Sequence, residues 1–487
     1  MRAPNLLFAP LLIAAALCAT SAGAAERPRV IAPAGTILGV QGDGFTSFKG
    51  IPYAAPPVGT LRWQKPKPAT KWTGDLDASD FGPSCMQPTP PAHVVPGSPA
   101  LTLSEDCLKL NIWAPEGAKK APVMVWIHGG GNQDGSPADF FTDGRNMARD
   151  GVVLVSVNYR LGLLGFFAHP GLIEDGKAVA NFGLWDQLAA LEWMKTNIAA
   201  FGGDPDNVTL FGQSAGGEDI IALLTTPAAR GLFTKAIVQS GGGGWGPAAD
   251  IKDLQTTIAA KFPSKTLADL RAMPAAELVK QNGDLGDPVV DHDLLPQTPL
   301  ATFVAGQAAD VPIIIGTTSE EGSLLGNSAQ DPTKSWDRLT RADLTALRTA
   351  YGDRAHDDTA FARLLFRDGY FTGPARFIAR HSNAYLYRFS YVLTPLQSRR
   401  TGAWHGSDVP YVFERWPIDP LDPTDLAVQA AVHRDWISFA RTGHPGWEAF
   451  KASGQEMRFD ATPSPRPLDH NVELDLLEKR LSPFSQP

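Results

Sequence analysis

Short apolar runs recur along the chain, and longer segments with polar positions separate them. The runs cover 123–127, 152–157, 208–211, 236–238, 311–315 and 384–389. Between the second and third runs, 184–198 carries apolar residues at the three- and four-residue spacing of an amphipathic helix. Short apolar strands that alternate with helices predict a mostly parallel sheet covered on both faces, which is an α/β fold.

Two later segments differ from this pattern. Residues 250–310 and 323–381 are richer in polar residues that favour helices. We expect them to be helical insertions that cap the sheet. Because no internal repeat or low-complexity linker divides the chain, 25–487 is expected to be a single domain.

The first residues have the pattern of a signal peptide, which we place at 1–24. Arg2 precedes an apolar run at 6–17, and small residues follow at 22–24. The apolar run is shorter than the roughly 20 residues that a membrane span needs, so no stable membrane anchor is expected. The sequence therefore predicts a secreted or periplasmic protein.

Cysteine usage fits export. Cys18 lies in the predicted signal peptide, which leaves Cys85 and Cys107 in the mature chain. Two cysteines in an exported protein indicate one disulfide, and two buried free thiols are the alternative. With no Cys-x-x-Cys motif or Cys/His cluster, the sequence predicts no metal site.

Composition and charge limit the partners. The chain of 487 residues is 43% hydrophobic and 19% charged, with a formal net charge of −8 and a pI of about 5.7. This acidity argues against a nucleic-acid partner and against electrostatic attachment to a membrane. It is compatible with a small neutral or cationic ligand.

The strongest local motif is Gly-x-Ser-x-Gly at 212–216, directly after the predicted strand 208–211. In a nucleophile elbow of this kind, a sharp turn between a strand and a helix lifts the serine clear of the backbone. Ser214 is therefore the candidate nucleophile. The alternative is an ordinary turn rich in glycine and serine.

Three glycines at 129–131 follow the predicted strand 123–127. Ester hydrolysis passes through an oxyanion, which preorganised backbone N–H groups stabilise. We expect the N–H groups of Gly130, Gly131 and Ala215 to form this oxyanion hole.

A serine nucleophile needs a base, and in this type of fold the chain order is serine, acid, histidine. His405 follows the predicted strand 384–389, whereas His381 precedes it and lies at the wrong edge. The acid should follow the strand 311–315, where both Glu320 and Glu321 occur. The pattern alone leaves the choice between these two glutamates open.

Two long segments resemble known signatures. Residues 201–217 closely resemble the active-site signature of the type-B carboxylesterases, a family that includes the cholinesterases, and 105–113 resembles its second signature. The similarity continues at 158–160, 239–241, 321–322, 405–406 and 442–445. It therefore extends over nearly the whole mature chain.

The resemblance implies an α/β-hydrolase fold with a central, mostly parallel sheet. It also implies a triad of Ser214, Glu321 and His405, because the family's acid directly precedes a glycine. The oxyanion hole and the Cys85–Cys107 pairing would be those named above. Two buried ion pairs, Arg62 with Glu105 and Arg160 with Asp186, complete what the resemblance implies.

The chain also departs from the family pattern. Gln213 stands where many relatives have glutamate, Asn132 where an aromatic residue is usual, and Glu218 where a small residue is usual. The loop 86–104 lacks the tryptophan with which cholinesterases bind choline, so we do not expect a cholinesterase. The trimmed insertions and the alanine-rich signal resemble bacterial members.

These observations predict a serine carboxylesterase that hydrolyses a small-molecule ester through an acyl-enzyme intermediate, without a cofactor. Hydrolysis of an amide or thioester by the same residues is an alternative. A non-catalytic binding protein is a second alternative, which the complete set of Ser214, Glu321 and His405 disfavours.

Overall fold

The computed structural model describes residues 27–89, 100–243, 249–283, 285–326, 338–417, 421–469 and 471–484. The predicted signal peptide at 1–24 and part of the loop 86–104 lie outside this range.

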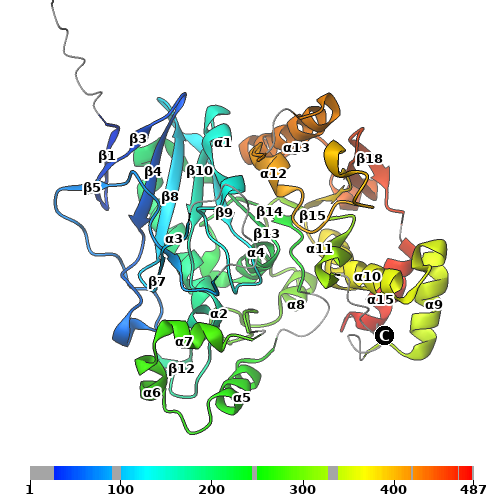
Figure 1. The fold of residues 1–487 in the computed structure, drawn as a ribbon, viewed down its shortest axis with the longest axis horizontal. Coiled ribbons are helices and arrows are strands. Elements are labelled where there is room, and N and C mark those ends of the chain that lie inside the picture. Colours follow the sequence, from blue (N-terminus) through cyan, green and yellow to red (C-terminus); the bar gives the residue numbers. More distant parts are fainter. Residues whose placement is uncertain are drawn as a thin grey trace, which may run out of the picture.

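A large mixed sheet forms the centre of the molecule (Figure 1). In the described part of the chain its strand order is β18-β17-β16-β15-β14-β13-β9-β10-β8-β4-β3. The strands from β10 to β17 in this order run parallel, and the others join antiparallel at the two edges. The strands are β3 (Val40–Gln41), β4 (Phe45–Pro52), β8 (Lys109–Pro115), β9 (Ala121–Ile127), β10 (Val153–Val157), β13 (Gly203–Gln213), β14 (Lys235–Gln239), β15 (Ile313–Thr318), β16 (Ala384–Phe389), β17 (Gln455–Phe459) and β18 (Ser464–Pro467).

Each of the six predicted apolar runs corresponds to one of the parallel strands, so the predicted α/β fold is confirmed. The run at 152–157 became β10, and that at 208–211 became the end of the longer β13. The apolar pattern did not predict the outer strands β4, β8 and β17. These strands lie near the edges, and the alternation of polar and apolar residues in them is less regular.

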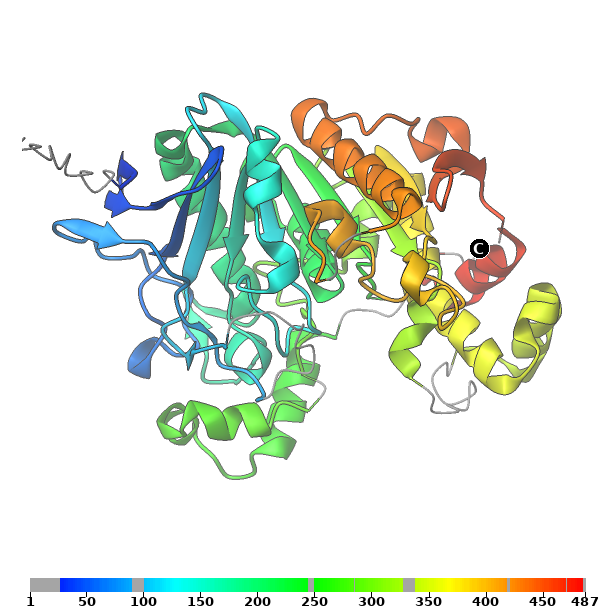
Figure 2. The same ribbon diagram turned by 45° about the horizontal axis from the view of Figure 1, so that its top comes forward.

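Helices cover both faces of the sheet (Figures 1 and 2). One face carries α1 (Arg145–Arg149), α12 (Val409–Phe413) and α13 (Pro423–Thr442). The other carries α3 (Phe182–Asn197), α4 (Ala215–Thr225), α8 (Pro299–Val304) and α11 (Gly373–His381).

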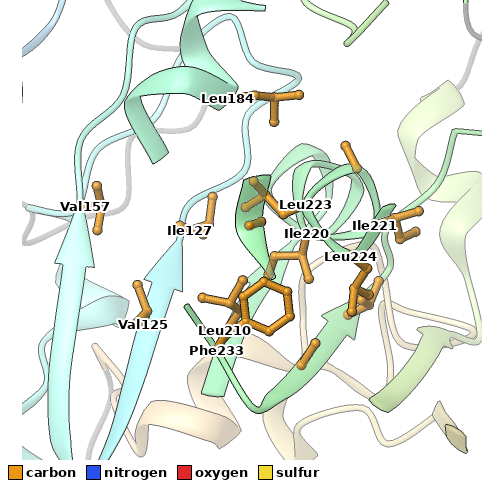
Figure 3. Packing of buried hydrophobic residues seen from close by; sticks show 14 of the residues in the cluster. Val125, Ile127, Val157, Leu184, Leu210, Ile220, Ile221, Leu223, Leu224 and Phe233 are labelled. Atoms are coloured by element: carbon orange, nitrogen blue, oxygen red, sulfur yellow. The ribbon is translucent and has the colours of Figure 1, made fainter. Parts of the chain in front are cut away.

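Alternation within the strands builds two cores. In β9, Val125 and Ile127 face the α3/α4 side, whereas Trp126 faces the α13 side. Figure 3 shows the first core, where the apolar residues of α4 pack on the strand residues Val125, Ile127 and Leu210. This packing fixes the start of α4 at the carboxyl end of β13.

The predicted insertions are helical. In the first, α5 (Ile251–Lys261), α6 (Leu267–Ala272) and α7 (Ala275–Lys280) project from the body of the molecule (Figure 1). Their apolar residues share a small core with residues of the body such as Trp63, Leu163 and Phe167. In the second, α9 (Arg341–Tyr351) and α10 (Asp358–Phe366) lie beside the C-terminal α15 (Asn471–Leu481). However, α11, which falls in the second insertion, packs on β15 and β16, and α8, which falls in the first, packs on α4 and α11.

The remaining elements are short. They are β1 (Arg29–Ala32), β2 (Gly35–Leu38), β5 (Asp75–Asp77), β6 (Ser84–Cys85), β7 (Leu103–Ser104), α2 (Gly162–Gly165), β11 (Ile173–Glu174), β12 (Lys177–Ala178) and α14 (Phe450–Ser453). Among the residues described, no helix has both the length and the apolar character needed to cross a membrane.

A disulfide and two ion pairs join segments that are separated along the chain. Cys85 and Cys107 form a buried disulfide with their Cα atoms 4.9 Å apart. The two ion pairs that the resemblance implies are also present. Arg62 Nη2 lies 2.5 Å from Glu105 Oε1, and Arg160 Nε lies 2.7 Å from Asp186 Oδ2.

The disulfide should contribute measurably to stability. It closes a loop across a sequence separation of 22 residues, and cross-linking a loop of this size stabilises a protein by about 3 kcal/mol. We expect the double variant C85A/C107A to lose about this much free energy of unfolding in a urea titration.

The single variant C107A should lose a similar amount, because it removes the same cross-link. An unchanged urea midpoint in both variants, or two freely alkylatable thiols in the non-reduced parent protein, would contradict the prediction.

Candidate active site

Ser214 occupies a strained turn between β13 and α4. Its φ of 58° and ψ of −130° lie in a region that residues with a side chain rarely adopt. The turn packs tightly on the end of β9, because a Cβ added at Gly216 would lie 2.2 Å from the carbonyl oxygen of Ile127. This is the geometry of the predicted nucleophile elbow.

The glycine loop after β9 lies directly beside the elbow. A Cβ added at Gly129 would lie 3.0 Å from Cβ of Ser214. The next residues turn sharply, with φ of 108° at Gly130 and 61° at Gly131. Among the described residues, we find no acceptor for the N–H groups of Gly130, Gly131 or Ala215. Within the described part of the chain, these three N–H groups therefore make no backbone hydrogen bond, and the loop that carries two of them adjoins Ser214.

The loops after β15 and β16 meet at the same edge of the sheet. The backbone N–H of Glu320 donates to the carbonyl of Ala403 at 2.9 Å, and Glu320 and Trp404 form an isolated parallel β-bridge. This pairing puts the next residues side by side. His405 Nδ1 and Glu321 Oε2 are 2.5 Å apart.

The carboxylate of Glu321 is completely buried and held from two sides. Its Oε1 accepts hydrogen bonds from the Ser240 hydroxyl at 2.6 Å and from the Thr318 N–H at 2.7 Å. Glu320, in contrast, is partly exposed and faces Arg363 at 4.0 Å. Of the two candidate acids, only Glu321 therefore contacts the imidazole.

The other side of the imidazole contacts Gln213. Gln213 Nε2 lies 3.0 Å from His405 Nε2. Because an amide nitrogen only donates, His405 Nε2 accepts here, and Nδ1 carries the proton that is donated to Glu321. Within the described residues, no hydrogen bond joins the Ser214 hydroxyl to His405. The structure thus brings His405 to the residue next to Ser214 and leaves the last contact unmade.

Two neighbouring carboxyl groups on α4, the half-buried Glu218 and the fully buried Asp219, have raised pKa values. Burial, reinforced by the charges of Asp287 and Asp219, raises the pKa of Glu218 to about 8. Burial also raises the pKa of Asp219 to about 7, although hydrogen bonds from Gln187 and Asn132 oppose the shift. At neutral pH, Glu218 is therefore mostly protonated, and the site carries less negative charge than the sequence suggests.

Sequence analysis missed several residues of this site. Ser240 lies in the segment 239–241, which contributed to the resemblance without a role. Phe371, whose ring centroid lies 5.2 Å from that of His405, had no signal. Asp219 could have been found from the sequence. A charged residue on a helix face that is otherwise apolar needs a buried partner.

One group of potential metal ligands lies elsewhere in the described part of the chain. Side-chain atoms of Asp150, Glu414 and His433 lie within 4.8 Å of one another. However, His433 Nδ1 donates to the Val412 carbonyl at 2.6 Å, and its Nε2 pairs with Asp150 at 2.8 Å. Both ring nitrogens are thus engaged by protein groups.

Comparison with known proteins agrees with the geometry. The model of the carboxylesterase family matches residues 26–464. The chain is 36% identical to phenmedipham hydrolase of Pseudarthrobacter oxydans, over 88% of this chain and 93% of the relative. It is 35% identical to para-nitrobenzyl esterase of Bacillus subtilis (strain 168), over 85% of this chain and 90% of the relative.

Solved structures show the same fold. A PNB esterase superimposes with a TM-score of 0.80 and 31% sequence identity, covering 93% of this chain and 100% of its own. A thermophilic PNB esterase gives a TM-score of 0.81 with 30% identity and the same coverage.

The raised pKa of Glu218 should make stability depend on pH. Between its usual value of 4.5 and about 8 the folded protein holds a proton that the unfolded chain has released. Stability is therefore lost progressively as the pH rises through this window. Because glutamine cannot ionise, the melting temperature of E218Q should rise relative to the parent between about pH 5 and about pH 9.

The control is E277Q, which changes an exposed glutamate on α7. Its melting temperature should follow that of the parent at every pH. A difference between E218Q and the parent that stays constant over the range would contradict the assignment.

Proposed function

The chain belongs to the carboxylesterase family and hydrolyses carboxylic esters, and from this premise we propose that Ser214, His405 and Glu321 form its catalytic triad. One observation carries the proposal. The buried Glu321 carboxylate contacts His405 Nδ1 at 2.5 Å, and the opposite ring nitrogen faces the residue before the strained Ser214.

In the proposed mechanism, His405 Nε2 turns from the Gln213 amide to the Ser214 hydroxyl and takes its proton. The Ser214 oxygen attacks the ester carbonyl, and the N–H groups of Gly130, Gly131 and Ala215 stabilise the oxyanion. The alcohol leaves with the proton from His405. Water then attacks the acyl-enzyme by the same route, which releases the acid and restores Ser214.

Glu321 acts through the imidazole. It holds the tautomer in which Nδ1 is protonated, so that Nε2 is free to accept a proton. It also stabilises the imidazolium that forms during each proton transfer. The bonds from Ser240 and Thr318 keep the carboxylate aimed at His405.

We propose a small-molecule ester as substrate. The relatives are named for different compounds, phenmedipham hydrolase, fumonisin B1 esterase and para-nitrobenzyl esterase. Family membership therefore leaves the particular ester open. We further propose that 1–24 is a cleaved signal peptide, that 25–487 is one catalytic domain, and that the protein is secreted or periplasmic, which the Cys85–Cys107 disulfide supports.

Replacing the nucleophile tests the proposal directly. We expect S214A to keep its circular dichroism spectrum and melting temperature while kcat for para-nitrophenyl esters falls by roughly a millionfold. The assay should include a matching amide and thioester, whose turnover would reveal the alternative activities. Substantial ester hydrolysis by folded S214A would mean that the nucleophile lies elsewhere.

The two neighbouring glutamates form a matched pair. E321Q should lower kcat by roughly ten-thousandfold, because the amide no longer selects the productive tautomer of His405. E320Q should keep nearly the parent kcat, since its side chain faces Arg363 instead. Steady-state kinetics of both variants test which glutamate is the acid of the triad. The reverse result would mean that the acid is Glu320.

A further inference from the structure

The two halves of the proposed oxyanion hole come from separate segments. Gly130 and Gly131 belong to the loop after β9, whereas Ala215 opens α4. An oxyanion hole works only when its donors converge on one oxygen position, and a displacement of about 1 Å can cost a hundredfold in rate. Something must therefore fix the glycine loop relative to the helix.

One side-chain contact spans this gap. Asn132, the residue after Gly131, donates from Nδ2 to Asp219 Oδ1 at 3.1 Å. Asp219 lies one helical turn beyond Ala215, and side chains on a helix point back towards its N-terminus. The contact thus links the residue next to the two glycines with the helix turn that carries Ala215.

Both partners are held from behind. Asp219 is completely buried, and its other oxygen accepts from Gln187 Nε2 at 2.5 Å. The Tyr159 hydroxyl lies 2.9 Å from Asn132 Oδ1, and the Gly162 N–H donates to the Asn132 carbonyl at 2.6 Å.

The backbone of Asn132 also adopts a positive φ of 53°. Such a conformation costs free energy, and asparagine tolerates it better than most residues. The positive φ and the three hydrogen bonds of Asn132 agree on one placement of this residue.

We propose that Asn132 and Asp219 are positioning residues that lock the two halves of the oxyanion hole at their working distance. The proposal rests on the function proposed above.

The main test is N132G, because glycine accepts the positive φ and the variant should fold. Losing the lock should lower kcat roughly tenfold to a hundredfold and change KM less than twofold. A trifluoromethyl ketone, which forms an oxyanion adduct with the nucleophilic serine, should bind more weakly by the same factor as the loss in kcat/KM. If Asn132 had a purely structural role, folded N132G would not lose inhibitor affinity and kcat/KM in parallel.

Asn181 supplies a matched control. It is also buried with a positive φ of 55°, and its Nδ2 donates to the buried Asp291 at 2.9 Å. N181G should lose stability while keeping the parent kcat and inhibitor affinity for the folded fraction.

Two further variants separate geometry from charge. D219A should resemble N132G, and N132G/D219A should be no worse than either single variant, because each breaks the same link. D219N should keep most of the activity. Its amide oxygen still accepts from Asn132. If the Gln187 amide turns over, the new NH₂ can donate to Gln187 Oε1, which has no partner among the described residues.

Parent-like kcat and inhibitor affinity in N132G would overturn the proposal, as would additive losses in the double variant. An equal loss in N181G would do the same. The triad proposal fails separately, through ester hydrolysis by S214A.

Discussion

The carboxyl ends of β9 and β13 approach so closely that no side chain fits between them. The two strands pair in parallel, with Ile127 opposite Gly212. A Cβ added at Gly212 would lie 2.7 Å from the Ile127 carbonyl oxygen. Because both chains continue from this point, one into the glycine loop and the other into the elbow, their pairing decides where Ser214 meets the oxyanion donors.

The apolar core maintains that approach. Apolar residues of α4 pack on those of β9 and β13 (Figure 3), and α4 begins directly after Ser214. A shift of α4 along the sheet would separate Ala215 from the glycine loop and would expose apolar surface, at about 25 cal/mol per Å². The same packing maintains the strained backbone conformation of Ser214, because it fixes the chain on both sides of the turn.

Much of this arrangement could be predicted from the sequence. The parallel strands, the elbow and the glycine loop are local patterns. Each depends on the residues of one short segment, so it can be predicted from that segment alone. The choice of Glu321 over Glu320 needed the family resemblance, because it depends on the pairing of Glu320 with Trp404 across distant segments. The contact of Gln213 with His405 and that of Asn132 with Asp219 depend on side-chain directions in the folded chain, which periodicity does not give.

The carboxylate of Glu321 differs from those of the two ion pairs described above. The buried Asp186 and the half-buried Glu105 are each paired with an arginine. Glu321 instead accepts bonds from a hydroxyl, a backbone N–H and His405, none of which carries a permanent positive charge. A fixed cation would satisfy the carboxylate before the reaction and weaken its attraction for the imidazolium. With neutral donors, the full attraction develops only when His405 takes the proton from Ser214, so the electrostatic stabilisation belongs to the transition state and not to the resting enzyme.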